Sequence, residues 1–343
     1  MTFYNNRVVV IENFKDILYI VRKIKNELFI EYINKGTNIF QNEKLISESM
    51  GEFDIDIDQI DDINILFIND NHDLMLTRLI ENTYETKIIL SGLKTRIFEL
   101  TLINIGSSQN IFYMQETEEK QIFKIYHIHI EDGKQIISLV DEIETYQIIN
   151  PLRIIKDDKN LILAYYFRNQ ICLKVYNTLT KIWSPSITLT NNQNKLYLDI
   201  MKVGGRIHLV YSVFNDDLFT IRYERFLINN DYILKEVELS LSTSGNNTDP
   251  ILIHYDKKIW IIWKDTNQLL SIYSEDGGKI WSSVYQWKNS KKMDVVKYKY
   301  LTNILDHNIK IDYSYGSIKP YIKFLGFGDL KDAEALQTKK VIN

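Results

Sequence analysis

The sequence predicts an all-β fold: a β-propeller of seven four-stranded antiparallel blades. The first observation is composition. The 343 residues are 45% hydrophobic, rich in Ile, Leu, Tyr, Val and Phe, and contain only six Met and four Pro. β-branched and aromatic side chains of this kind favour strands over helices. The second observation is that short apolar runs alternate with polar turns along the whole chain, without a helical period. The third is that this pattern repeats.

One hairpin type recurs: an apolar strand, a tight polar turn and a second apolar strand. Its turns fall near Asn26, His72, Glu119, Asn169, Asp216, Thr266 and Gly316. A second series of turns falls near Lys35, Asn82, Asp132, Leu179, Asn230, Asp276 and Gly326. Both series have a period of 46 to 51 residues, so each unit holds four antiparallel strands. A sandwich has no such repeat, and a parallel β-helix has a shorter one.

The innermost strand of each blade precedes the hairpin. We expect these strands at residues 7–12, 54–60, 96–102, 152–155, 197–203, 250–254 and 295–301. The chain is then a single domain, 1–343, with blades at approximately 1–48, 49–94, 95–146, 147–193, 194–243, 244–291 and 292–343.

The last blade is the weakest unit. Its fourth strand has to come from residues 329–343, which could equally form a terminal helix, in which case residues 1–6 supply the closing strand. Six blades with a C-terminal appendage are the alternative.

Charge and composition argue against several classes of protein. A net charge of −4, without a Lys/Arg cluster, argues against a nucleic-acid partner. The single cysteine, Cys172, lies in an apolar run, which predicts a buried residue and no intramolecular disulfide. No Sec signal begins the chain, and the longest apolar runs are too short for a membrane span. We expect a soluble protein, cytoplasmic or released without a Sec signal. Because the abundance of Ile, Asn and Lys suggests an AT-rich genome, we also expect a bacterial source.

One turn carries a family resemblance. Residues 274–281, SEDGGKIW, match the pattern Ser/Thr-x-Asp-x-Gly-x-x-Trp through Ser274, Asp276, Gly278 and Trp281. The Asp can accept backbone N–H bonds across the turn, the Gly permits positive φ, and the Trp packs in the blade. Partial copies occur as EDG at 131–133 and KIWS at 181–184. The chain thus resembles the Asp-box (BNR-repeat) propellers of the sialidase-like superfamily. In that family the turn is structural and lies away from the active site, so we assign it no functional role.

The resemblance also implies what a sialidase would need: three arginines that hold the substrate carboxylate, a Tyr/Glu nucleophile pair and an Asp acid/base. Only nine arginines occur, and none lies in an early Arg-Ile-Pro type motif. No phosphate loop, serine-nucleophile elbow or zinc-protease motif is present either. We therefore lean toward a protein that is not an enzyme, and we name no catalytic residue.

A candidate ligand site comes from the repeat itself, because an Asp, Asn or Glu leads into each innermost strand. In a propeller these positions and the hairpin turns lie on one face, around the mouth of the central channel. The predicted ligand-binding residues are Asp54, Glu99, Asn150, Asp199, Asp249 and Asp294, with His72, Arg168 and Asp217 from the hairpins. The alternative interpretation is that each acceptor caps its own turn between blades.

Metal binding has little support in the sequence. Asp54, Asp56 and Asp58 alternate, so their carboxylates project from one side of a strand. The run lacks the Gly and the Glu of an EF-hand loop, so we expect at most weak calcium binding there and no other cofactor. His127 and His129 share a strand side but have no evident third ligand, and we predict no metal site.

The function predicted from these features is non-enzymatic binding of a protein or a glycan at the channel-mouth face. The main rival is a glycosidase-like hydrolase, which needs two opposed carboxyl groups about 5–9.5 Å apart. A third possibility is a structural subunit of a larger assembly, which predicts an apolar surface patch of several hundred Å².

Overall fold

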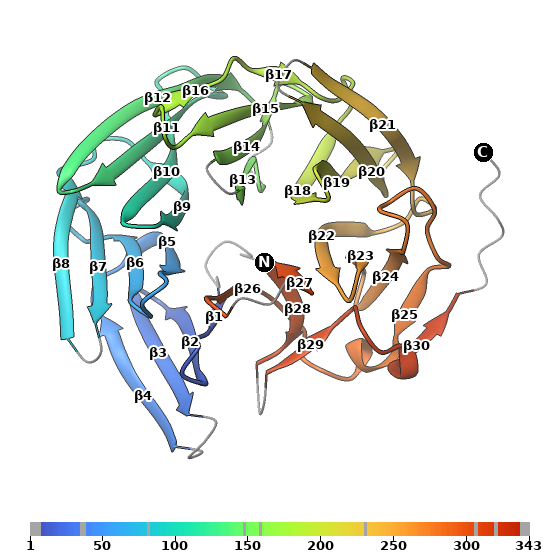
Figure 1. The fold of residues 1–343 in the computed structure, drawn as a ribbon, viewed down its shortest axis with the longest axis horizontal. Helices are drawn as coiled ribbons and strands as arrows, with labels where there is room; N and C mark the ends of the chain where they lie inside the picture. The colour runs from blue at the N-terminus through green and yellow to red at the C-terminus, as the bar shows by residue number, and fades with distance from the viewer. Residues whose placement is uncertain are drawn as a thin grey trace. The chain divides into compact units, whose positions relative to one another are not determined.

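The computed structural model describes residues 8–34, 39–80, 83–146, 149–157, 160–229, 232–304, 308–318 and 322–336. These residues form β-strands and two short 3-10 helices, η1 (Lys288–Lys291) and η2 (Leu330–Asp332), as Figure 1 shows. Within the described ranges, no helix has the length and apolar character needed to cross a bilayer. The chain divides into two compact units: residues 1–144 with 298–305, and residues 145–297 with 306–343.

Unit one holds three antiparallel sheets whose strands follow in chain order. The strands are β1 (Val8–Glu12), β2 (Ile17–Ile24), β3 (Glu27–Asn34) and β4 (Ile39–Ile46); β5 (Met50–Ile57), β6 (Ile63–Ile68), β7 (Leu74–Ile80) and β8 (Thr83–Leu90); and β9 (Ile97–Ile105), β10 (Ser108–Glu116), β11 (Ile122–Glu131) and β12 (Lys134–Glu144). The first sheet gains a strand that the repeat did not predict as its neighbour. Residues 299–302 of β26 (Val296–Thr302) pair parallel with β1, from Val9 opposite Lys299 to Glu12 opposite Thr302.

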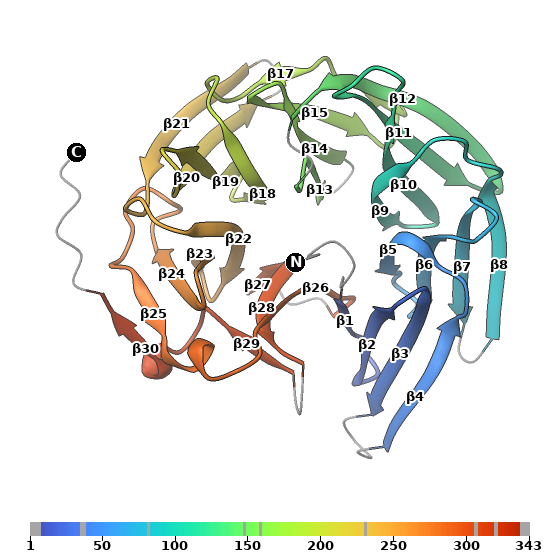
Figure 2. The same ribbon diagram turned by 180° about the vertical axis from the view of Figure 1, so that it is seen from behind.

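Unit two holds three further sheets built in the same way (Figure 2). Their strands are β13 (Leu152–Asp157), β14 (Asn160–Phe167), β15 (Gln170–Asn177), β16 (Ile182–Trp183) and β17 (Ile187–Thr188); β18 (Lys195–Val203), β19 (Arg206–Asn215), β20 (Leu218–Asn229) and β21 (Tyr232–Ser240); and β22 (Asn247–Tyr255), β23 (Lys258–Asp265), β24 (Gln268–Ser274) and β25 (Tyr285–Trp287). Sheets of four antiparallel strands, repeated along the chain, make the fold one of the β-propeller type. The number of blades stays a prediction.

The end of the chain differs from the predicted seventh unit. The predicted hairpin turn at Gly316 is wrong, because Gly316 lies inside β28 (Tyr313–Ser317), which pairs with β29 (Lys323–Leu325). The strand before it, β27 (Ile309–Ile311), pairs instead with β22. Residues 333–335 form neither a terminal helix nor a strand of that unit; they are β30 (Ala333–Ala335), which pairs with β25. The closing strand predicted at residues 1–6, and residues 337–343, lie outside the described residues.

The interior of each unit contains strands that are covered on both faces. Every residue of β6 is buried, as are the central residues of β14 and β19. These second strands read as continuous apolar runs, because sheets pack against both of their faces. Cys172, on β15, is buried, as predicted, and its Sγ lies 3.7 Å from Thr188 Oγ1.

Four of the innermost strands, β5, β9, β18 and β22, share a bulge near their start. Gly51, Glu99, Tyr197 and Asp249 have φ between +55° and +60°, and each coincides with a register shift against the second strand of its sheet. A bulge of this kind needs a residue in the left-handed region, which Gly, Asn and Asp adopt more readily than other residues. Part of the acidic series seen in the sequence therefore reflects backbone conformation.

Candidate functional site

In unit one, the predicted acceptor Asp54 joins neighbouring innermost strands. Its Oδ2 accepts the backbone N–H of Leu102 on β9 at 2.8 Å, and Lys299 Nζ donates to its two oxygens at 2.9 and 2.8 Å. Asp56 Oδ2 accepts Asn104 N in the same way at 2.6 Å. These side chains supply acceptors to N–H groups of β9, which forms the inner edge of its sheet and has a described neighbouring strand of that sheet, β10, on one side only.

In unit two, Asp199 has the same role, and Asp249 forms an ion pair with a lysine of β26. Asp199 accepts the N–H of Leu252 on β22 at 2.8 Å, and Arg153 donates to its Oδ1 through Nε at 3.0 Å and Nη2 at 2.8 Å. Lys297 Nζ lies 2.5 Å from Asp249 Oδ1. Burial opposes the charge on Asp249, but Lys297 and Lys264 outweigh it and hold the pKa of that carboxyl below its usual value.

The other predicted ligand residues lie at the starts of innermost strands and in turns. Glu99 and Asn150 have positive φ at the start of innermost strands, and Asp294 is exposed. His72, Arg168 and Asp217 are exposed turn residues that also have positive φ. The alternative interpretation, in which each acidic residue caps its own turn, does not describe Asp54 and Asp199. Both accept a hydrogen bond from a backbone N–H of the next innermost strand. The predicted residues belong to both units, and ligand binding by them stays a prediction.

The residues considered for metals are engaged with the protein. Asp58 Oδ1 accepts the N–H groups of Ile60 and Asp62, both at 3.0 Å. His127 Nε2 and His129 Nδ1 both contact Asn110 Oδ1, at 3.0 and 3.1 Å. Burial, with a smaller contribution from His129, lowers the pKa of His127 to about 3. In the described part of the chain, no group of three or more His, Cys, Asp or Glu side chains is placed to hold a metal ion. Weak calcium binding stays a prediction.

The turn at residues 274–281 has the hydrogen bonds that its sequence suggests. Asp276 Oδ1 accepts the N–H of Lys279 at 2.9 Å and of Ile280 at 3.0 Å, and Ser274 Oγ accepts the N–H of Gly278 at 2.8 Å. Trp281 packs edge-on against Tyr223 with ring centroids 4.8 Å apart. The partial copy at 181–184 shares one further contact with this turn. Ser184 Oγ accepts the N–H of Val175, and Ser282 Oγ accepts the N–H of Tyr273, in each case nine residues earlier in the chain. These contacts give the turn a structural role.

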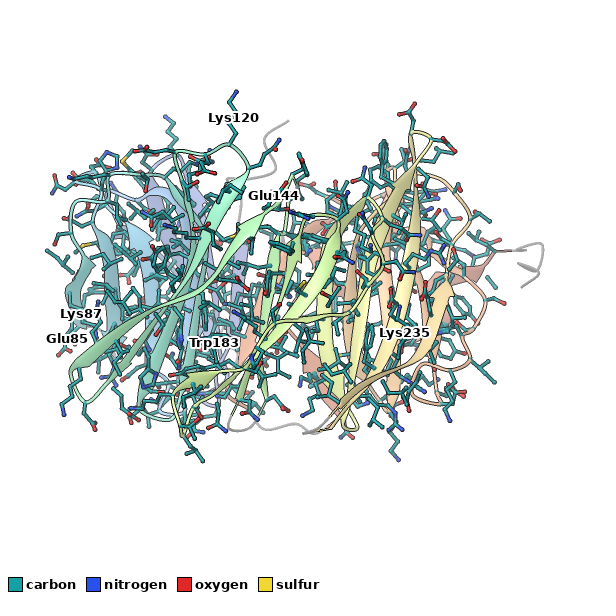
Figure 3. All side chains as sticks on the ribbon, turned by 90° about the horizontal axis from the view of Figure 1, so that it is seen from above. Glu85, Lys87, Lys120, Glu144, Trp183 and Lys235 are labelled. Carbon is teal, nitrogen blue, oxygen red and sulfur yellow. The ribbon has the colours of Figure 1, made fainter. Side chains whose placement is uncertain are left out.

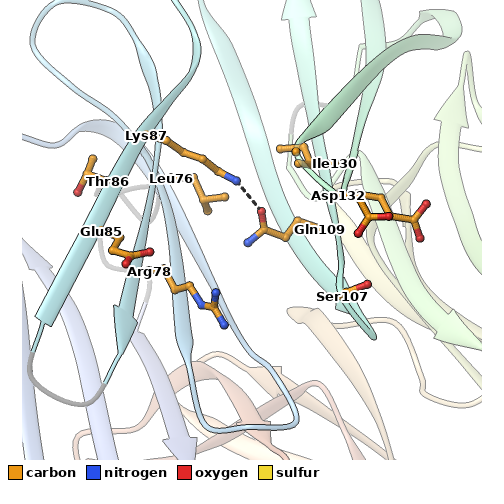
Figure 4. Close-up of a pocket in the computed structure, with 11 residues that line it drawn as sticks. Leu76, Arg78, Glu85, Thr86, Lys87, Ser107, Gln109, Ile130 and Asp132 are labelled. Atoms are coloured by element: carbon orange, nitrogen blue, oxygen red, sulfur yellow. Dashed lines mark hydrogen bonds between the residues drawn. The ribbon is translucent and has the colours of Figure 1, made fainter.

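A groove that the sequence did not predict lies in unit one, between the sheet β5–β8 and the sheet β9–β12 (Figure 4). Its volume is about 430 Å³, within the range of small-molecule sites. Buried Leu76 and Ile130 contribute apolar surface. Polar side chains and turn residues from the two sheets complete the lining: Arg78, Glu85, Thr86 and Lys87 from the first, and Ser107, Gln109, Glu131, Asp132 and Gly133 from the second.

Buried residues hold the polar side chains of the groove in place. Lys87 Nζ donates to Gln109 Oε1 at 3.0 Å, which joins the two sheets across the groove. Gln109 Nε2 in turn donates to Asn64 Oδ1 at 2.9 Å, and Asn64 is almost fully buried. Arg78 forms an ion pair with buried Asp62. Because their partners are fixed by packing, these side chains need little reordering when a ligand binds.

The electrostatics of the groove favour an acceptor or an anion beside Lys87. Partial burial, and then the nearby Arg78, lower the pKa of Lys87 below its usual value. An anionic group placed there would relieve the repulsion between these two cations. Carboxylates lie on both walls, Glu85 on β8 and Glu131 and Asp132 at the end of β11. Glu85 and Lys87 lie toward the rim of the unit, as Figure 3 shows. The groove can therefore bind a ligand that has both an anionic group and hydroxyl donors.

The sequence contained one trace of this site. The EDG at 131–133 is a partial copy of the turn motif, and two of its residues, Asp132 and Gly133, have the positive φ of a tight turn. Nothing in the spacing showed that this turn faces β7 and β8, about 50 residues earlier, because that neighbourhood exists only once the sheets pack.

The fold is similar to that of solved structures. Ulvan lyase, described as a new family of polysaccharide lyase, has a TM-score of 0.57 at 10% identity, over 92% of this chain and 97% of that chain. The same lyase bound to -[GlcA(1-4)Rha3S]- has a TM-score of 0.56 at 10% identity, over 93% and 98% of the two chains. A protein from Lactobacillus plantarum has a TM-score of 0.52 at 12% identity, over 80% and 82%. No family model and no curated protein sequence matches this chain. These similarities establish a shared fold, and the Asp-box resemblance rests on residues 274–281.

Proposed function

We propose that this protein is a non-enzymatic binding protein that recognises a glycan carrying an anionic group, and that the groove between the sheets β5–β8 and β9–β12 is its binding site. The observation that carries the proposal is the lining of the groove, where charged and amide side chains are already held by buried Asn64 and Asp62. A site prepared in this way loses little conformational entropy on binding.

The groove offers distinct partners to the parts of such a ligand. Lys87 and Arg78 suit a carboxylate or a sulfate, since charge-assisted hydrogen bonds are the strong ones. Gln109 and Asp132 suit sugar hydroxyls, which both donate and accept. Leu76 and Ile130 suit the C–H face of a sugar ring. The glycan named in the ulvan lyase structure carries both uronate and sulfate, which supports the choice of ligand class.

An array of neutral, uronate-containing and sulfated glycans, followed by calorimetry, tests the proposal. We expect binding to acidic glycans, and a loss of affinity of about tenfold or more for Lys87→Gln, because one charge-assisted hydrogen bond contributes about 1.5–3 kcal/mol. The matched control is Lys44→Gln on β4, whose side chain pairs with Glu27 at 2.6 Å outside the groove. Equal affinities of the two variants, or binding that is confined to neutral glycans, would contradict the proposal.

A glycosidase-like hydrolase is the second candidate, and the carboxylates on facing walls of the groove favour it. Glu85 lies on one wall and Asp132 on the other (Figure 4). Hydrolysis by such a pair needs one acid and one base or nucleophile. A screen with fluorogenic glycosides decides: turnover that is lost in both Glu85→Gln and Asp132→Asn would establish the hydrolase, whereas binding without turnover favours the first proposal.

Three finer predictions from the sequence continue as proposals. They are the seven blades, ligand binding at the channel-mouth residues, and weak calcium binding near Asp54, Asp56 and Asp58. For calcium, a calorimetric titration that gives heat in the wild type and none in Asp56→Asn would support the proposal. A titration without heat, and with an unchanged melting temperature, would overturn it.

A further inference from the structure

The sheets of unit two have turns at two ends, and one end holds the turn at residues 274–281. In an antiparallel sheet, the turn after the first strand and the turn after the third lie at the same end. Contacts between sheets bring these ends together: Lys202 of β18 forms an ion pair with Asp157 of β13, and its carbonyl accepts a hydrogen bond from Lys310 at 3.1 Å. Lys310 lies on β27, opposite His254 of β22. This end of unit two therefore contains four described turns, at residues 177–182, 203–206, 255–258 and 274–281.

The charges of the two ends have opposite sign. The four turns above carry five cations and three acids: Lys181, Arg206, Lys257, Lys258 and Lys279, with Asp256, Glu275 and Asp276. The described hairpin turns at the other end, 167–170, 215–218 and 265–268, carry one cation and three acids: Arg168, with Asp216, Asp217 and Asp265. We call the first of these the basic end of unit two. On a protein with a net charge of −4, such an asymmetry directs the basic end toward anionic surfaces.

The basic end also carries the most exposed large apolar side chains in the described part of unit two. Leu179, Ile182 and Ile280 are 68%, 66% and 75% exposed. Ile182 and Ile280 have the same place in two copies of Lys-Ile-Trp, so a lysine followed by an exposed isoleucine occurs at corresponding turns of two sheets. Tyr255, 37% exposed, adds an amphipathic ring close to Lys257. Apolar side chains that recur beside lysines on one end of a unit indicate a binding surface.

The turns hold these side chains in fixed positions. Asn177 Oδ1 accepts the N–H of Leu179 at 3.0 Å, and Asp276 makes the equivalent bonds in the later turn. The Trp that follows the first exposed isoleucine packs inward, because the ring centroids of Trp183 and Tyr176 are 5.2 Å apart. A side chain on a turn that is already ordered loses little conformational entropy when it is buried against a partner.

We propose that the basic end of unit two binds the surface of an anionic lipid bilayer, with the tips of its turns in the headgroup region and its lysines against lipid phosphates. Peripheral binding of this kind combines buried apolar area with attraction to anionic lipids, and the basic end offers both. A protein partner fits this surface less well, because the cores of protein interfaces are depleted in lysine. The proposal is independent of glycan binding, since the groove belongs to unit one.

Flotation of the full chain with lipid vesicles tests the proposal. We expect binding to vesicles of phosphatidylcholine and phosphatidylglycerol at about three to one, and binding at least about tenfold weaker to phosphatidylcholine alone. Ile280→Ser should lower the partition coefficient about tenfold, because the apolar tip no longer enters the headgroup region. The matched control is Leu218→Ser, a 42% exposed leucine at the opposite end, which should bind as the wild type does. A wild type that does not bind anionic vesicles, equal binding to both kinds of vesicle, or equal losses in the two variants would overturn the proposal.

Two further variants give results that a loss of folding cannot mimic. Lys279→Gln should lower the affinity for anionic vesicles about fivefold at low salt, and added salt should reduce this difference. Ile280→Trp should bind more tightly than the wild type, and its fluorescence should move to shorter wavelength when anionic vesicles are added, because Trp favours the membrane interface. Leu218→Trp should show neither change. Unchanged melting temperatures confirm that the variants fold. Fluorescence of bound Ile280→Trp that does not respond to the vesicles would show that this end stays out of the bilayer, and would refute the proposal.

Discussion

Replacement of Asp54 by Ala is the most direct test of how the innermost strands are held together. The carboxylate accepts two hydrogen bonds from Lys299 and one from the N–H of Leu102. The Asp54 and Lys299 side chains are only 5% and 14% exposed. Removal of one partner from a buried ion pair costs about 3–5 kcal/mol, because the remaining charge is left in a poorly solvated place. The orphaned N–H of Leu102 belongs to the same loss, so we expect about 4 kcal/mol in all.

Far-UV circular dichroism during urea and thermal unfolding measures this loss. For a compact unit of this size, about 4 kcal/mol corresponds to a fall in melting temperature of roughly 10 °C. Asp294→Ala is the control, because Asp294 belongs to the same predicted series but is exposed, and it should change stability by less than about 0.5 kcal/mol. If Asp54→Ala is as mild as Asp294→Ala, the carboxylate does not hold the strands.

A double-mutant cycle separates the pair from the loss of a side chain. Lys299→Met should also destabilise the protein, because it leaves the carboxylate of Asp54 buried without its cation. The double variant should cost less than the sum of the singles, by a coupling of about 1–3 kcal/mol. Strict additivity would contradict the reasoning even if each single variant were destabilised.

The remaining predictions concern the turn, the groove and a buried histidine. Gly278→Ala should lower the free energy of unfolding by about 3 kcal/mol, because φ is +89° and the added Cβ would lie 1.9 Å from Tyr223 Oη. Gly277→Ala, at a φ of +74° with open space around it, should lower the same free energy by about 1 kcal/mol, and thermal unfolding of both variants measures the difference. Calorimetry against pH should show that affinity for an acidic glycan falls as pH rises through the lowered pKa of Lys87, where the ammonium loses its proton, and Lys87→Gln should remove this dependence. The pKa of His127 is about 3 in the folded protein and 6.5 when unperturbed, so the unfolded chain takes up the proton first. The free energy of unfolding should therefore fall as pH drops from 6.5 toward 3, and urea titrations should show a shallower fall in His127→Gln.

Local patterns in the sequence were enough to predict the strands and their turns. The innermost strand expected at 197–203 is β18 (Lys195–Val203), and the one expected at 250–254 lies within β22 (Asn247–Tyr255). The turn at Ser274 has the hydrogen bonds that its residue types suggested. These features depend on neighbours within a few residues, through alternation of side chains and through turn chemistry, and both can be read directly from the sequence.

The acidic series shows where such reading becomes incomplete. Asp54, Asp199 and Asp249 were found from their spacing, but their partners Lys299, Arg153 and Lys297 were not. The recurrence of an acidic residue in each repeat indicates that a hydrogen-bond acceptor is needed at that position. It does not say which donor reaches it, because the donor comes from another part of the chain.

The sequence by itself determined that this protein is built of four-stranded antiparallel units with a fixed period, since propensity, alternation and turn chemistry act over a few residues. Only the tertiary structure decided that β26 pairs parallel with β1, that β27 and β30 join the sixth sheet, and that Lys87 meets Gln109 across a groove. The reason is physical. Contacts between sheets depend on which surfaces come together when apolar faces are buried, and the same strand pattern permits many such arrangements.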